Sequence, residues 1–266
     1  MVTLSVVLVA GVGCLIIYAV SRALELHPTT IWIDNPRREM RMAIVVLLAS
    51  SLVIVVLNFV LIRYAWPWLD SMNLRAGPHD LILLTITGIM NVIFLLPMML
   101  GIRRTRQPLA SIGVTRQDAF VMVKYGIVLS LIFSSFYIVL ALLEGSNIIN
   151  ATTTYFVTTY LVGTIGRCAF VILIMGYIQT RVTVYASSLR GVVAAALLYA
   201  PFASSLGLPT QMLFGALDAY QIMYGMLAAV AWGFILGYVK RMSGSIIPDL
   251  IFMASTGWIQ VLFNIQ

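Results

Sequence analysis

Residues 43–62 read AIVVLLASSLVIVVLNFVLI, a run of 20 residues without a charged side chain. An α-helix needs about 20 predominantly apolar residues to cross the hydrocarbon core of a bilayer. Only helices and closed barrels satisfy every backbone donor and acceptor in lipid, and the run lacks the alternation of a barrel strand. This stretch therefore predicts a transmembrane α-helix.

The rest of the chain repeats this pattern. Of its 266 residues, 61% are hydrophobic and 9% are charged, whereas a soluble domain carries about 25% charged residues. The sequence predicts an all-α fold, a polytopic transmembrane bundle of about eight helices with no extramembrane domain. The expected spans are Val2–Leu24, Ala43–Trp66, Leu81–Ile102, Phe120–Leu143, Phe156–Thr180, Gly191–Leu208, Tyr220–Val239 and Ile246–Ile265.

The basic residues are unevenly distributed, and the formal net charge is +7. Thirteen Lys and Arg residues lie in or beside the connections after helices one, three, five and seven, against Arg63 and Arg75 on the other side. The positive-inside rule predicts that these four connections are cytoplasmic and that both termini lie outside. The charge is thus an orientation signal, and the expected partners are the lipid bilayer and other membrane subunits, not nucleic acid.

Catalytic and metal-binding groups are scarce. Cys14 and Cys168 fall in apolar runs and are interpreted as small hydrophobic residues, while His27 and His79 fall in loops. Proteolysis inside a membrane needs a base or an activated water at the depth in the bilayer where the peptide bond is cut. The sequence lacks a His-Glu-x-x-His string and has one candidate intramembrane aspartate, Asp249. We therefore expect no metal site and no cofactor.

Four fragments nevertheless occur in an informative order. They are PLASIGVTR (residues 108–116), GYIQTR (176–181), LLYAPFA (197–203) and GYVKRMSGSIIP (237–248). In order and in position at helix ends, they resemble the CPBP family of membrane proteins, which includes the CAAX prenyl endopeptidases and bacteriocin-immunity-type proteins. The resemblance implies a CPBP-like core of helices four to eight in residues 108–266, preceded by peripheral helices one to three in residues 1–107.

The catalytic positions of that family are replaced. The family motifs contain paired glutamates, an arginine, two histidines and an Asn or Asp, and the glutamates and histidines are thought to activate a water for peptide hydrolysis. Helices five and six contain neither Glu nor His. The resemblance therefore implies the fold but argues against the activity, as expected for a pseudoprotease. The matching positions are Phe170 and Val171 for the glutamates, Met175 for the arginine, Ala203 and Phe252 for the histidines, and Thr256 for the Asn.

Arg167 is a charged residue near the middle of the fifth expected helix. A charge at that depth costs about 2.5–3.5 kcal/mol on insertion scales, so an acceptor is required. One interpretation is a bound anionic ligand, lipid headgroup or partner carboxylate. The other is a structural arginine bonded to backbone carbonyls or to hydroxyls such as that of Thr164.

Three functional interpretations follow. The favoured one is a non-catalytic structural or partner-binding subunit of a membrane assembly. The second is a ligand- or anion-binding carrier that uses Arg167, although Pro97 and Pro201 lie in no evident internal repeat of the transporter kind. The third is a CAAX-type intramembrane protease with residual activity, which would need catalytic groups from a partner.

Overall fold

The computed structural model describes residues 2–26, 31, 33–71, 86, 88–90, 92–114, 119–143, 153–213 and 219–263. All regular elements in these ranges are helices, and none of these residues forms a strand, which confirms the all-α prediction. The elements are α1 (Val2–Ala23), α2 (Pro36–Val60), η1 (Leu61–Ala65), α3 (Trp66–Ser71), α5 (Leu96–Thr105), η2 (Leu109–Ile112), α6 (Ala119–Leu143), α7 (Thr153–Val171), η3 (Ile172–Gln179), α8 (Thr180–Tyr185), α9 (Ser188–Leu213), α10 (Ala219–Ser243) and α11 (Ile247–Phe263).

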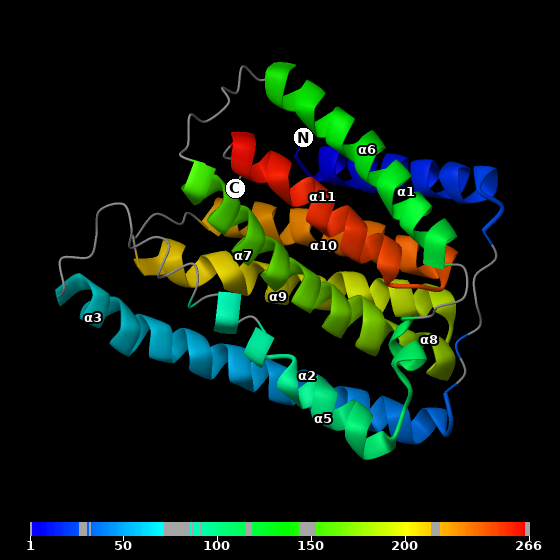
Figure 1. Cartoon of the computed structure of the whole chain (residues 1–266), viewed down its shortest axis with the longest axis horizontal. Helices are drawn as coiled ribbons and strands as arrows, with labels where there is room; N and C mark the ends of the chain where they lie inside the picture. Colours follow the sequence, from blue (N-terminus) through cyan, green and yellow to red (C-terminus); the bar gives the residue numbers. More distant parts are fainter. Residues whose placement is uncertain are drawn as a thin grey trace.

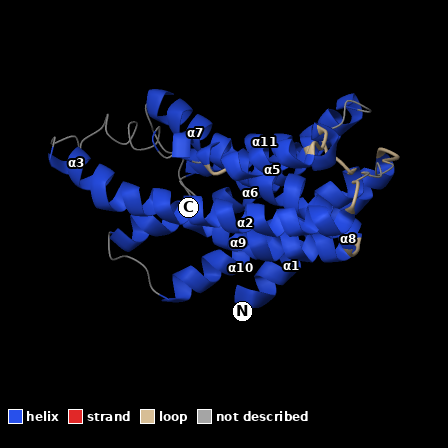
Figure 2. Cartoon of the chain, turned by 90° about the horizontal axis from the view of Figure 1, so that it is seen from below, coloured by secondary structure: helices blue, strands red, loops and turns tan. Residues whose placement is uncertain are grey.

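The helices pack as a bundle (Figures 1 and 2). In Figure 1, α2 and α5 lie along one edge, α1 and α6 lie along the opposite edge, and α7, α9, α10 and α11 lie between them. The principal helix contacts join α9 to α10, α10 to α1, and α11 to both α6 and α7. Elements far apart in the sequence therefore meet throughout the interior.

Four helical stretches in the described part of the chain are long and apolar enough to cross a membrane: Pro36–Val60, Ala119–Phe136, Gly163–Tyr185 and Met223–Ser243. Shorter apolar stretches lie in α1, α9 and α11. The chain is thus an integral membrane protein. The start of the expected span Leu81–Ile102 and two further positions within it, residues 81–85, 87 and 91, lie outside the described residues. The count of eight helices therefore stays a prediction.

Helix α2 begins seven residues before the expected start of its span, at Pro36 instead of Ala43. The side chain of Asn35 accepts a hydrogen bond from the backbone N–H of Arg38, at 3.2 Å, and Pro36 occupies the first turn. Both residues are typical of a helix start. The polar segment that we expected to be a loop is therefore helical, and Glu39 lies in the first turn of α2.

The fifth expected span also extends further than the sequence suggested. Helices α7, η3 and α8 follow one another without a break from Thr153 to Tyr185, whereas we expected the span to end at Thr180. The middle section, η3, is π-helical over Ile172–Gln179. Such wider turns are rare and frequently lie at functional sites. Arg181 consequently lies in a helix and not in a loop.

One apolar core crosses the expected boundary between residues 107 and 108. Ile17, Val46 and Phe94 from the first part of the chain belong to the same buried cluster as Phe170 and Phe252 from the second part. The assignment of residues 1–107 as a peripheral unit stays a prediction, and the packing is continuous across it.

The helix ends that carry most of the basic residues meet at one end of the bundle, on the right in Figure 1. We call it the basic end. It comprises the end of α1, the start of α2, the end of α5, the start of α6, helix α8, the start of α9 and the end of α10. Its residues are Arg22, Arg37, Arg38, Arg41, Arg103, Arg104, Arg106, Lys124, Arg181, Arg190, Lys240 and Arg241, while Arg116 lies outside the described residues.

Candidate functional site

The positions that match the family's catalytic residues lie in the apolar core. Phe170, Val171, Met175 and Phe252 are each no more than 1% exposed and belong to one buried cluster. The ring of Phe170 stacks on Phe94, with centroids 4.6 Å apart. None of these four side chains can act as a base, as water activation by general-base catalysis requires.

Further aromatic rings surround these positions. Phe170 meets Phe202 edge to face at 5.9 Å. Phe252 meets Phe133 at 5.0 Å and Trp232 at 5.6 Å. These contacts join α6, α9, α10 and α11 around the two phenylalanines.

Thr256 and Ala203 are the two remaining residues that match catalytic positions of the family. Thr256 is buried, and its hydroxyl donates to the carbonyl of Phe252 at 2.8 Å, within its own helix. Ala203 lies in α9, one residue after Phe202, and its side chain lies outside the described set. The structure thus brings Phe170, Val171, Met175 and Phe252 together in one packed core.

Arg167 lies in α7, about one turn before Phe170 and Val171, and is half-buried. Its guanidinium folds back along α7, because a Cβ on Gly163 would lie 3.1 Å from Nη2 of Arg167. Tyr160 and Tyr199 are near enough to interact with it electrostatically. The hydroxyl of Thr164 is buried without a hydrogen-bond partner, so the acceptor suggested from the sequence is not used.

The most extensive polar cluster centres on a residue that sequence reasoning missed, Arg181. Its Nε donates to Oε2 of Glu39 at 3.3 Å. Nη1 donates to the carbonyls of Ser111 and Tyr177 at 3.3 and 3.2 Å, and Nη2 donates to Oγ of Ser111 at 3.4 Å. The guanidinium carbon lies 3.6 Å from the centre of the Tyr177 ring. One buried side chain therefore links α2, η2 and α8.

The connection that contains η2 is inserted into the basic end. Ser111, Ile112 and Gly113 are buried, and the carbonyl of Gly113 accepts hydrogen bonds from Ile246 N and Ser245 Oγ at 3.1 and 3.0 Å. Gly113 has a φ of +83°, which an L side chain rarely adopts. On the other side, a Cβ on Gly176 would lie 3.2 Å from the Ile112 carbonyl. Ile112, in the first fragment, and Gly176, the glycine of the second fragment, thus pack together.

Lys240 and Asp249 form a second buried polar group at the same end. Lys240 is 4% exposed and donates from Nζ to the Gly244 carbonyl at 3.2 Å. Asp249 is fully buried, and neither carboxylate oxygen has a hydrogen-bond partner among the described residues. The two charges attract each other electrostatically.

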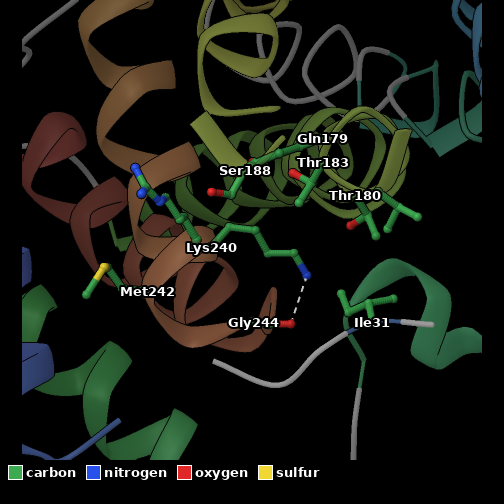
Figure 3. Close-up of a pocket in the computed structure, with 10 residues that line it drawn as sticks. Ile31, Gln179, Thr180, Thr183, Ser188, Lys240, Met242 and Gly244 are labelled. Atoms are coloured by element: carbon green, nitrogen blue, oxygen red, sulfur yellow. Dashed lines mark hydrogen bonds between the residues drawn. The ribbon is translucent and has the colours of Figure 1, made fainter. Parts of the chain in front are cut away.

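A pocket of about 580 Å³ lies beside Lys240, between the end of η3, helix α8, the start of α9 and the end of α10 (Figure 3). Nε2 of Gln179 donates to the Gly237 carbonyl at 2.7 Å, while Oε1 of Gln179 is buried without a partner. Figure 3 shows the Lys240 side chain reaching across the pocket toward Gly244. The polar lining residues are Gln179, Thr180, Thr183, Ser188, Lys240 and Arg241.

The described residues contain no group of three or more His, Cys, Asp or Glu side chains placed to hold a metal ion. His27 and His79 lie outside the described part of the chain. Comparisons with known proteins find no family model, curated protein or solved structure that matches this sequence. The CPBP resemblance accordingly rests on the four fragments alone.

Proposed function

We propose that the chain is a non-catalytic subunit of a membrane assembly, with a structural or partner-binding role and a CPBP-like core in helices four to eight. The observation that supports this best is the packing of Phe170, Val171, Met175 and Phe252 in one apolar core. A membrane hydrolase needs polar groups and a water at that place. Aromatic rings occupy the corresponding positions here.

The buried polar groups also suit a structural role. Arg181 makes its hydrogen bonds to other parts of the same chain, across α2, η2 and α8. Buried charges arranged in this way hold helices in one relative position. The hydrogen bonds of Arg181 would hold α2, η2 and α8 in one relative position at the basic end, as a structural subunit requires.

The outer surface of α2 offers a place for lipid or for a partner helix. Leu48, Leu52, Val55 and Phe59 are exposed and follow one another at helical spacing along one face. In our proposal this face lies in the bilayer, the bundle has eight spans, the basic end faces the cytoplasm and both termini lie outside.

Arg167 is our candidate for a contact with a partner. Charged side chains inside a span are costly and commonly mark functional sites. Arg167 is half-buried, so part of its side chain is accessible to a neighbouring helix or ligand. A partner carboxylate near Tyr160 and Tyr199 would match its charge.

Copurification tests the partner-binding role. The wild-type chain and Arg167→Met are extracted in mild detergent, and associated proteins and thermal stability are measured together. We expect Arg167→Met to stay folded and to release the associated subunits. Arg63→Met, which removes an exposed arginine, serves as the control and should retain them. Unchanged association of Arg167→Met would contradict the binding role.

A protease assay tests the non-catalytic assignment separately. The purified chain is incubated with a prenylated peptide and with a transmembrane peptide, and cleavage is compared with a protein-free control. We expect no cleavage above that control. Cleavage that persists in Phe170→Ala would show both that the chain is an enzyme and that this position is not part of its site.

A further inference from the structure

The pocket beside Lys240 combines a suitable size with an unusual set of polar groups. Its volume of about 580 Å³ falls within the range of about 300–1,000 Å³ that is typical of small-ligand pockets. It lies at the basic end and is lined by two cationic side chains, Lys240 and Arg241. Their charge favours an anionic occupant.

The ammonium group of Lys240 has N–H donors that are not used in the hydrogen bond to Gly244. An ammonium group carries three N–H donors, and one of them bonds to the Gly244 carbonyl. Asp249 attracts the ammonium but makes no direct hydrogen bond to it. A buried charge is costly unless its donors are satisfied, so an anion in the pocket would complete the surroundings of Lys240. Arg241 is exposed at the rim, where it can reach the same ligand.

Gln179, which also lines the pocket, has an acceptor without a partner. The Gly237 carbonyl can only accept, so the amide nitrogen of Gln179 faces it and Oε1 points elsewhere. Gln179 is 2% exposed and its Oε1 has no partner. Leaving such an acceptor unsatisfied costs about 1–3 kcal/mol. A hydroxyl or amine on the ligand would satisfy it.

The start of α9 adds to the attraction for an anion. Ser188 is the first residue of this 26-residue helix and lines the pocket. The first turn of a helix carries a partial positive charge and backbone N–H donors, which favour phosphate. This feature acts together with the buried Lys240 and the unsatisfied Gln179, which are independent of it.

We infer that this pocket binds a phosphate ester that also carries a hydroxyl or amine. The phosphate lies against Lys240, Arg241 and the start of α9, and the hydroxyl or amine donates to Oε1 of Gln179. Such a ligand is either the headgroup of an anionic phospholipid or a small water-soluble phosphate ester. This inference is independent of the pseudoprotease proposal, because none of these residues lies in the aromatic core.

Binding can be measured directly in non-ionic detergent by native mass spectrometry. The chain is mixed with phosphatidylglycerol in one series and with glycerol 3-phosphate in another, with sulfate as an ion control. We expect one bound phosphate ester per chain. Arg241→Met should raise the Kd about tenfold, because it removes a charge-assisted hydrogen bond worth about 1.4 kcal/mol. Arg104→Met removes an exposed arginine on α5, outside the pocket lining, and should leave the Kd unchanged.

The position of the ligand can be checked on the same samples. The chain contains two lysines, Lys124 and Lys240, so acetylation of one can be compared with that of the other. Ligand should slow acetylation of Lys240 and leave exposed Lys124 unaffected. As a second readout, Gln179→Leu should reduce the preference for the phosphate ester over sulfate, because the acceptor for the ligand's donor is lost.

The outcomes separate the two ligand sources. Binding of phosphatidylglycerol alone assigns a lipid headgroup, and binding of glycerol 3-phosphate alone assigns a small water-soluble phosphate ester. Binding of both assigns a site for phosphate esters in general. Equal binding of sulfate, or no binding of any of the three, would overturn the inference. So would an Arg241→Met variant that binds as tightly as the wild type.

Discussion

The Nε atom of Arg181 lies 3.3 Å from Oε2 of Glu39, in an ion pair whose side chains are 0% and 2% exposed. The pair joins the first turn of α2 to α8 across 142 positions of sequence. Removing two charges from water is costly, and the attraction between them offsets that cost only when further hydrogen bonds are made. Ser111 and Tyr177 supply those bonds.

Removing one member of this pair should be more harmful than removing both. We expect Glu39→Met to lower the free energy of unfolding by about 3–5 kcal/mol, because it leaves the Arg181 charge buried without a counter-ion. The double variant with Arg181→Met should lose less than that. Glu25→Met removes an exposed carboxylate and is the control. Unfolding in mixed micelles measures all four chains, and equal losses in the single and double variants would argue against the coupling.

The helices could be predicted from the sequence more readily than this pair. Uninterrupted apolar runs are a strong local signal, and the described helices lie where those runs occur. Glu39 and Arg181 each looked like polar residues in loops, because nothing local indicates that two residues so far apart will meet. One local signal was available: an Asn-Pro pair at residues 35–36 is typical of a helix start, and it places Glu39 inside α2.

The close packing of α9 on α10 depends on a glycine. A Cβ on Gly233 would lie 2.8 Å from Cβ of Tyr199 and 2.9 Å from Cα of Ala196. Because these atoms belong to backbone or lie next to it, they cannot move aside cheaply. We expect Gly233→Ala to reduce the free energy of unfolding by about 1–3 kcal/mol.

A glycine on the same helix provides the control for that change. A Cβ on Gly225 would meet nothing within 4 Å. Gly225→Ala should therefore be neutral or should stabilise by up to about 1 kcal/mol, through its better helix propensity. If both variants lose similar stability, close approach at Gly233 is not the cause.

Phe170 should contribute to stability as a core residue. It is 1% exposed, stacks on Phe94 and meets Phe202 edge to face. We expect Phe170→Ala to cost about 3–5 kcal/mol of unfolding free energy, because a cavity remains where the ring was. Phe120 is 80% exposed, so Phe120→Ala is the matched control and should change stability by less than about 0.5 kcal/mol. A tolerated Phe170→Ala would mean that the ring is not part of a packed core.

The candidate site could be predicted only in part, because contacts between residues far apart in the sequence leave no local signal. The sequence shows that Phe170 and Phe252 replace polar residues of the family pattern, but their common core is a result of folding. The pocket was not foreseen at all. Its lining residues come from η3, α8, α9 and α10 and from two positions outside the helices, and the unsatisfied Oε1 of Gln179 becomes apparent only once Nε2 is seen to bond to Gly237.

The orientation of the bundle in the membrane is the last prediction. Twelve basic residues meet at one end of the described structure, whereas Arg63 lies toward the far end of α2. The positive-inside rule places the basic end in the cytoplasm, and an even number of spans then places both termini outside.

Cys14 and Cys168 are partly accessible, so both are first replaced by alanine. In whole cells a membrane-impermeant thiol reagent should then label a cysteine added after Gln266. It should label Arg104→Cys, at the exposed end of α5, only after the membrane is permeabilised. The opposite result would reverse the orientation, and labelling of both positions in intact cells would contradict the five spans expected between them.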